Sequence, residues 1–380
     1  MNPRITMALR RAIDELRALD LDDAFEPRAA EVIVEAGLHR LCVPAEAGGL
    51  GASMVEAAEV LMALGAVDAA TALGFAMQVH VTGAMRDAPA FPDGIRDRLW
   101  RAIVDDGALV NNAATEDGGG SPARGAIPGT TAAPDAEDGA WRLSGEKTWT
   151  TWLPNLTHAF VTARIGDQEP AEVGIFLLDL GTEEGDGRVD RRQGFEAMGM
   201  RGSASGRLGL LGASAELVAR RQVSQPDPRG AAPGAWFGIA VAATYLGVGE
   251  GARTEVARWA IDRRPGDGGT AVSDLPSVQL RLGRMDLELR AARIVVLDAA
   301  RRWDDQREAG EIVVAKLIAT RAAVVATDEA LRIAGGPGFL AGRLERAFRD
   351  ARAGLINPPL EDVALAGFGR AVVERERDSS

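Results

Sequence analysis

The chain has 380 residues, a hydrophobic content of 46% and a formal net charge of -12 at pH 7. This length and composition suffice for one large hydrophobic core or two to three smaller ones, which excludes a disordered chain. Nucleic acids and anionic membranes attract basic proteins, so the acidic charge argues against both as partners. The single cysteine, Cys42, excludes an internal disulfide bond, and no N-terminal segment resembles a signal peptide. We therefore expect a globular, cytoplasmic protein.

Metal and membrane binding are not expected. The three histidines, His39, His80 and His158, are too few for a histidine-rich centre, and we expect them to be ordinary core or surface residues. No apolar run approaches the roughly 20 residues that a membrane-spanning helix needs.

The pattern of apolar residues changes twice along the chain. Residues 1–108 carry them at three- and four-residue steps, which predicts an N-terminal helical domain. Residues 109–223 contain short apolar runs separated by Gly, Asp and Pro, which predicts a central β domain. The expected strands are Thr157 to Ile165, Val173 to Leu180 and Leu208 to Leu211. A linker from Ser224 to Gly234 then begins a C-terminal helical domain, residues 224–380.

Two long helices are expected in the C-terminal domain. From Val278 to Trp303, apolar residues alternate between three- and four-residue steps, a pattern typical of a helix in a bundle. From about Glu311 to Ile333, few charges and many alanines and valines predict a helix covered on most faces. Helices, then strands, then helices indicate an α+β fold instead of alternating βαβ units.

Three further segments have compositions that suit ligand binding. In Ala114 to Ser121, hydroxyl groups flank a run of glycines, which lets backbone amides approach a ligand, although the segment taken alone favours a glycine-rich surface turn. Gly139 to Thr151 alternates like a hairpin and is expected to bring Trp149 and Thr151 to one strand face, a surface that suits a flat heterocycle. In Ile333 to Phe339, glycines close a long helix.

In this order and at these separations, the segments resemble the acyl-CoA dehydrogenase family over nearly the whole chain. Further matches are Leu41 to Gly51, Met198 to Arg201, Ala315-Lys316 and Arg349-Asp350-Ala351. The resemblance implies a helical N-terminal domain, a central β-barrel-like domain and a C-terminal four-helix bundle. It also implies a dimer or tetramer that binds FAD between the β domain and the bundle.

The resemblance implies roles for particular residues in holding FAD. Thr115, Gly120 and Ser121 match positions along the isoalloxazine ring and pyrophosphate. Trp149 matches an indole packed on the ring, and Thr151 matches a hydroxyl at the reactive edge of the flavin.

The residues that match the adenosine half of the FAD site follow the family's pattern less closely than those that match the flavin half. Arg263 matches an arginine that reaches the FAD of a neighbouring subunit, and Gly335 and Gly336 match a loop along the adenosine. The family's Arg-x-x-Phe-Gly pattern is lost after Arg263, and Arg332 replaces a glutamine. Arg332 could restore a phosphate contact from a new direction.

The family's catalytic glutamate is absent from both positions where it is usually found. Pro358 occupies the usual position, and Phe237 occupies the alternative one on the first bundle helix. Neither residue can remove the α-proton that must leave when hydride passes to flavin. Glu361 and Asp362 lie close by in sequence and are candidate replacement bases, although acidic residues are also favoured at the start of a helix.

Three functions remain open. The first is a flavin oxidoreductase acting on an acyl thioester of coenzyme A or acyl carrier protein, with an unconventional base. The second is a flavin monooxygenase, supplied by a flavin reductase or another electron-transfer partner, which does not need the glutamate. The third is a non-redox subunit that keeps the fold, and the presence of Trp149 and Thr151 argues against it.

Overall fold

The computed structural model describes all residues except 20, 119–125, 137–138, 193, 267–268 and 380. Its contacts divide the chain into two compact units, which are described separately. Unit 1 comprises Met1–Ala57, Leu73–Ala197 and Arg201–Phe237, and unit 2 comprises Ala58–Ala72, Met198–Met200 and Gly238–Ser380. The boundaries at 108 and 223 that the sequence indicates for three domains remain a prediction.

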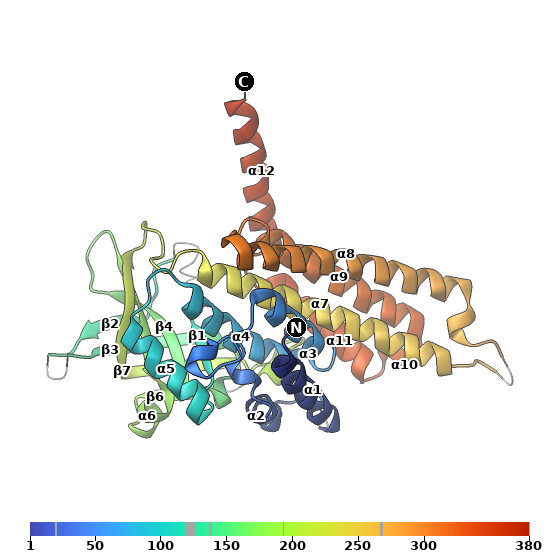
Figure 1. Ribbon diagram of the computed structural model, residues 1–380, viewed down its shortest axis with the longest axis horizontal. Coiled ribbons are helices and arrows are strands. Elements are labelled where there is room, and N and C mark those ends of the chain that lie inside the picture. The colour runs from blue at the N-terminus through green and yellow to red at the C-terminus, as the bar shows by residue number, and fades with distance from the viewer. Residues whose placement is uncertain (20, 119–125, 137–138, 193, 267–268, 380) are drawn as a thin grey trace. The chain divides into compact units, whose positions relative to one another are not determined.

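Unit 1 combines helices with a β-barrel (Figure 1). Its helices are α1 (Pro3–Ala18), α2 (Pro27–Glu35), α5 (Asp93–Asp106), α6 (Leu180–Gly185) and the unit 1 parts of α3 (Met54–Gly65), α4 (Ala69–Asp87) and α7 (Ala232–Asp262). Its strands are β1 (Val110–Ala113), β2 (Thr131–Pro134), β3 (Trp141–Thr150), β4 (His158–Ile165), β5 (Glu172–Asp179), β6 (Val189–Arg192) and β7 (Gly206–Gln222). The expected strands therefore form, although Leu208 to Leu211 is only part of the much longer β7.

The sheet closes on itself. Its strand order is β1-β4-β2-β3-β7-β5, and β5 also pairs with β4, so β4, β2, β3, β7 and β5 form a ring. Parallel β1 joins β4, and antiparallel β6 joins β7. The predicted barrel-like α+β architecture is confirmed.

Helices α4 and α5 share one hydrophobic core with the barrel. Val81 and Met85 from α4 and Trp100 from α5 are buried together with Phe160 of β4 and Ile175 of β5. Burying such large side chains contributes roughly 1.5–3 kcal/mol each, which fixes α4 against the strands. The side chains that α4 directs toward β1 and β4 are therefore held in place.

Glycine in α4 allows a tryptophan to approach its backbone. A Cβ atom on Gly74 would lie 2.0 Å from the indole of Trp152, which directly follows Thr151. Gly74 costs helix propensity relative to alanine but leaves room for this indole. The chain at the end of β3 is therefore anchored on α4.

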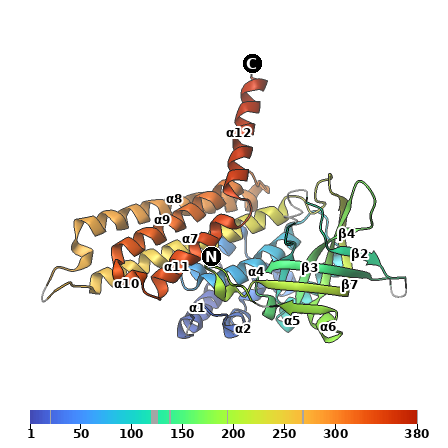
Figure 2. The same ribbon diagram turned by 180° about the vertical axis from the view of Figure 1, so that it is seen from behind.

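Unit 2 is a helical bundle with one protruding helix. It contains residues 238–262 of α7 together with α8 (Pro276–Gln306), α9 (Ile312–Ala334), α10 (Gly336–Phe339), α11 (Arg343–Ile356) and α12 (Glu361–Asp378). Both views show α8 and α9 side by side, whereas α12 extends away from them (Figures 1 and 2). The two long helices expected after residues 276 and 311 are confirmed.

Small residues bring the bundle helices close together. A Cβ atom on Gly249 of α7 would lie 2.7 Å from Leu289 of α8 and 3.0 Å from Ala323 of α9. Helix α7 is long and apolar enough to cross a membrane by length and composition, but 83% of its most apolar window is buried inside the protein. This burial is typical of a core helix of the bundle.

Candidate functional site

The end of β3 places Trp149 and Thr151 on different sides of the chain. A register shift between Lys147 and Thr150 interrupts the pairing of β3 with β7, and Trp149 has a φ of 57°. The indole is 53% exposed, whereas Thr151 is buried. The expectation that both side chains share a regular strand face was therefore wrong, because the bulge breaks the two-residue alternation. The segment is also one long strand, whose antiparallel hairpin partner is β2.

The exposed indole of Trp149 is held by a neighbouring aromatic ring. Its ring packs edge-on against Phe195, with centroids 5.3 Å apart and an interplanar angle of 82°. A left-handed backbone at a non-glycine residue costs on the order of 1–3 kcal/mol and persists only when its surroundings enforce it. Trp149 therefore presents a fixed aromatic surface at the end of the barrel.

A chain of hydrogen bonds runs through Thr151 toward β1. Its hydroxyl lies 3.0 Å from that of Ser205, which in turn lies 3.0 Å from that of Ser203. The Asn111 side chain donates to the Thr151 carbonyl at 3.0 Å. Oδ1 of Asn111 accepts from the backbone N–H of Asn112 at 2.6 Å. Sequence reasoning did not single out these two asparagines or two serines. The sequence feature that could have identified the asparagines is the polar pair Asn111-Asn112, which lies in a strand just before Thr115.

Thr115 lies beside β3, because its carbonyl accepts a hydrogen bond from the Thr148 amide at 2.8 Å. The adjoining Glu116 pairs with the fully buried Lys147 and also accepts from the Thr130 hydroxyl at 2.7 Å. Burial alone would raise the pKa of Glu116, but the hydrogen bonds from Lys147 and Thr130 outweigh it and lower that pKa. The motif residues Gly120 and Ser121 lie outside the described residues.

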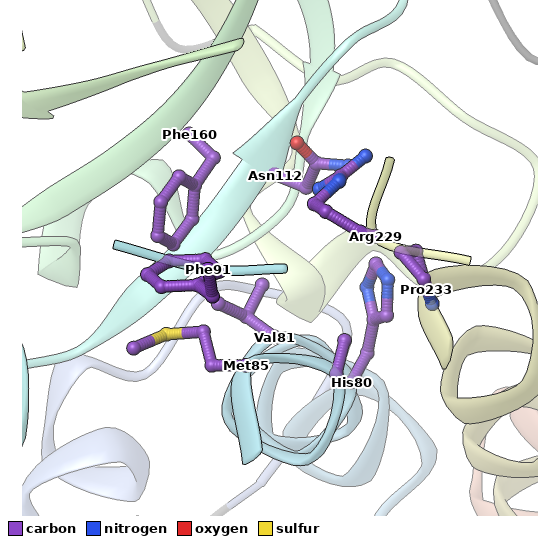
Figure 3. A pocket seen from close by; sticks show the side chains of 9 residues that line it. His80, Val81, Met85, Phe91, Asn112, Phe160, Arg229 and Pro233 are labelled. Carbon is purple, nitrogen blue, oxygen red and sulfur yellow. The ribbon is translucent and has the colours of Figure 1, made fainter. Parts of the chain in front are cut away.

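A pocket within unit 1 opens beside Asn112. Its apolar wall includes Phe91, Phe160 and Met85, and its polar wall consists of His80, Asn112 and Arg229 (Figure 3). Burial and the Arg229 charge lower the pKa of His80 to about 3, so the ring is neutral at physiological pH. Phe237, which matches the alternative position of the family's glutamate, packs edge-on against the His80 ring. The two ring centroids are 5.2 Å apart. No carboxylate is among the described residues that line the pocket.

The residues matching the adenosine half belong to unit 2. Arg332 is bound to Asp328 at 2.7 Å near the end of α9. Gly335 follows with a φ of 61°, a conformation that glycine adopts readily, and Gly336 begins α10. Arg263 is exposed just after α7.

The segment carrying Pro358 is held by polar contacts within unit 2. Asn357 donates to the hydroxyl of the buried Tyr245 at 3.2 Å, and Lys316 donates to the Pro359 carbonyl at 3.1 Å. Glu361 and Asp362 form the first turn of α12, the position that acidic residues favour. The Arg321 guanidinium bonds Glu361 at 2.5 and 3.1 Å and lowers its pKa, which makes Glu361 a weak base.

Another buried carboxyl group, Asp350 in α11, holds a loop of unit 2. Its Oδ1 accepts from the Met200 amide at 2.5 Å, and Arg349 donates to the Met198 carbonyl at 2.9 Å. Two sequence motifs, Met198 to Arg201 and Arg349-Asp350-Ala351, are therefore in contact. Burial raises the pKa of Asp350 to about 6.

The comparisons with known proteins agree with this fold. Models of the acyl-CoA dehydrogenase N-terminal, middle and C-terminal domains match residues 6–88, 111–211 and 236–357. A Bacillus subtilis (strain 168) protein named "Putative acyl-CoA dehydrogenase YdbM" is 32% identical over 364 residues, in an alignment that covers 93% of this chain and 93% of that protein. The chain belongs to the acyl-CoA dehydrogenase family.

Solved structures share its fold at low identity. Butyryl-CoA dehydrogenase from Megasphaera elsdenii has a TM-score of 0.84 at 19% identity, covering 98% of this chain and 99% of that one. Dibenzothiophene monooxygenase TdsC from Paenibacillus sp. A11-2 has a TM-score of 0.75 at 19% identity, covering 94% of each chain. TdsC has also been solved with FMN and indole.

The raised pKa of Asp350 predicts a pH-dependent effect of Asp350→Asn. Because the native state favours the protonated carboxyl, its stability falls as pH rises from about 4 through about 6. Asparagine keeps an acceptor for Met200 and cannot ionise, so the variant should gain stability relative to the wild type as pH rises. Two units of pKa correspond to about 3 kcal/mol, as an upper bound. Urea unfolding at pH 5 and pH 8 measures this difference, and an equal or larger loss in the variant at pH 8 would contradict it.

Proposed function

We propose that this chain is a flavin-dependent oxidoreductase whose flavin, once reduced, passes its electrons to molecular oxygen. The observation that carries the proposal is the end of β3, where the fixed and exposed indole of Trp149 stands two residues before the buried hydroxyl group of Thr151. When bound, the flavin would supply two-electron redox chemistry, with a partner reductase as the donor of electrons. Monooxygenation of a small substrate is the reaction class that we favour.

The residues of unit 1 fit the ring of a flavin. The indole of Trp149 is 53% exposed between the buried Thr148 and Thr150, so its ring is the part of this strand end that a ligand can reach. An indole gives stacking area to a flat heterocycle, and Thr151, bonded to Ser205, is held in one orientation. Trp149 would hold the ring, and Thr151 would bond its edge.

The weak basicity of the residues near Thr151 and His80 favours oxygen chemistry over thioester desaturation. The residues around Thr151 and in the His80 pocket are hydroxyls, amides, a guanidinium and an imidazole, and the lowered pKa of His80, about 3, makes this imidazole a weak base. Pro358 and Phe237 supply no base, and Arg321 makes Glu361 a poor one. Reaction with oxygen needs no such base.

A second candidate function is desaturation of an acyl thioester, with Glu361 or Asp362 as the general base. The sequence identity to the Bacillus subtilis relative favours this function. FAD is the cofactor that the family resemblance implies. Arg263, Gly335 and Gly336 would then serve its adenosine half. Since Arg332 is already paired with Asp328, FMN is the alternative, and the flavin released on denaturation identifies which is bound.

Substitutions in β3 test the placement of the flavin. Trp149→Ala removes the stacking surface and should weaken flavin binding about tenfold, or about 1.4 kcal/mol, in a fluorescence titration. Trp141→Ala, at the opposite end of β3, is the matched control and should leave the affinity unchanged. Thr151→Val should chiefly alter the rate at which the bound flavin is reduced or reoxidised. Equal affinity in the wild type and Trp149→Ala would remove the main support for this placement.

Anaerobic mixing separates the two candidate reactions. Purified protein should fail to bleach its flavin rapidly with saturated acyl-CoA thioesters, because a general base contributes typically about 10²–10⁴-fold in rate. Chemically reduced flavoprotein should instead be reoxidised rapidly when oxygen is admitted. Rapid anaerobic bleaching that vanishes in Glu361→Gln or Asp362→Asn would establish desaturation in place of oxygen chemistry.

We also propose that the chain assembles with a second copy through α8. Leu280, Leu287 and Ile294 recur every seven residues on this helix and are 70%, 67% and 70% exposed, so they form one apolar stripe. An isologous contact between two such stripes would cover them. Self-association through this stripe is consistent with the dimer or tetramer that the family resemblance implies.

Sedimentation at micromolar concentration tests this assembly. The wild type should sediment as a dimer or tetramer, and Leu287→Glu should shift it to a smaller species by placing charge in the contact. Leu211→Glu is the matched control, because Leu211 is 67% exposed on β7 and lies outside the stripe. A wild type that is only monomeric would contradict the proposal, as would identical behaviour of the two variants.

A further inference from the structure

Three hydroxyl groups of unit 1, those of Ser203, Ser205 and Thr151, form a line that we call the hydroxyl line. The Ser205 hydroxyl lies in the middle, 3.0 Å from that of Thr151 and 3.0 Å from that of Ser203. Exposure falls along the line, from 7% for Thr151 to 5% for Ser205 and 0% for Ser203. One end is therefore fully buried, and the other end is the hydroxyl group that the proposed function assigns to the edge of the flavin.

The backbone holds both serines in place. The last residue pair between β3 and β7 precedes Thr151 and follows Ser205, so the antiparallel register sets these two residues side by side. The Trp152 amide donates to the Ser203 carbonyl at 2.9 Å. Between the serines, Ala204 has a left-handed φ of 45°, a conformation that persists only where its surroundings enforce it. The line is therefore built into the fold.

The protons of the hydroxyl line determine what it can bind. Each hydroxyl carries one proton, and the two contacts between the three groups use only two of these protons. At the Ser203 end, the remaining proton would be a buried donor without an acceptor, because this hydroxyl has no further hydrogen bond among the described residues. If Ser203 donates to Ser205 and Ser205 donates to Thr151, the remaining proton lies on Thr151, where a ligand can accept it.

This direction of donation distinguishes the two oxidation states of a flavin. The oxidised ring has unprotonated nitrogen atoms that accept hydrogen bonds, whereas two-electron reduction is accompanied by protonation of a ring nitrogen, which then donates. An acceptor beside Thr151 uses the last proton of the line, and donation from Ser205 polarises the Thr151 hydroxyl and makes it a better donor. An N–H group beside Thr151 leaves one hydroxyl proton without an acceptor. The line therefore complements the oxidised ring.

We propose that Ser205 is a positioning residue, which directs the Thr151 proton toward the flavin and makes the site prefer oxidised flavin over reduced flavin. Ser203 supports it by donating to Ser205. This inference rests on the proposed function and deepens it. A flavin that is bound more weakly when reduced is a stronger reductant, which suits the transfer of its electrons to oxygen.

The preference is measured by titrating the flavin-free full chain with FAD and with FMN, each in the oxidised form and after anaerobic reduction by dithionite. The wild type should bind the oxidised form about tenfold more tightly, which sets the potential of the bound flavin about 30 mV below that of the free flavin. Ser205→Ala should lower the preference to about threefold, chiefly by weakening the binding of the oxidised form. A purely structural role would change the unfolding temperature without changing this ratio of affinities.

Matched variants separate the hydroxyl line from the rest of the barrel. Ser205→Thr keeps a hydroxyl group and should preserve the tenfold preference. Ser214→Ala is the control, because Ser214 pairs with Arg142 at the opposite end of β3 and lies outside the line, and it should also preserve the preference. Ser205→Cys provides a second variant if Ser205→Ala does not fold. A thiol is a weaker donor, so the preference should fall in the same direction.

The outcomes distinguish this inference from the proposed function. Equal affinities of the wild type for oxidised and reduced flavin would overturn the inference, as would the same preference in the wild type and in folded Ser205→Ala. Flavin is bound in both cases, so the proposed function would stand. A wild type that binds neither FAD nor FMN would overturn the proposed function and the inference with it.

Discussion

The bulge at the end of β3 determines what the barrel presents to a ligand. From Ser144 to Lys147, the strand pairs in unbroken register with β7, and the buried pair of Lys147 with Glu116 ties it to the segment after β1. Beyond that point, Trp149 takes a left-handed conformation and its indole turns outward, while Thr151 turns inward. A regular strand would have placed the side chains of residues 149 and 151 on one face. The bulge instead gives a stacking surface and a buried hydroxyl within three residues.

The buried hydroxyl connects this surface to the rest of unit 1. Thr151 bonds Ser205 on one side and Asn111 on the other, and Asn112 extends the connection to the pocket beside His80. The core that α4 shares with the strands holds the helix that carries His80 against the barrel. Hydrogen bonds therefore join the end of β3 to a residue that lines the pocket. Under the proposed function, Pro358 at the position that matches the family's glutamate would change the reaction without removing the site.

Much of the fold was predictable because its signals are local. The apolar periodicity of Val278 to Trp303 is visible without any structure, and the closing glycines of α9 are equally direct. The conformation of Trp149 was not predictable, because a bulge depends on pairing with β7, which lies more than 50 residues away in sequence. The pocket escaped prediction for the same reason: His80, Asn112 and Arg229 converge only when α4, β1 and the segment before α7 are packed together.

The visible absorption spectrum of the purified protein, followed by titration of the flavin-free chain with FAD and FMN, tests the central claim most directly. The account predicts bound flavin, saturating at one per chain, with a spectrum perturbed by contact with the indole of Trp149. It further predicts that Trp149→Ala reduces this perturbation and the affinity together. A purified wild-type protein that carries no flavin and binds neither FAD nor FMN would contradict the account.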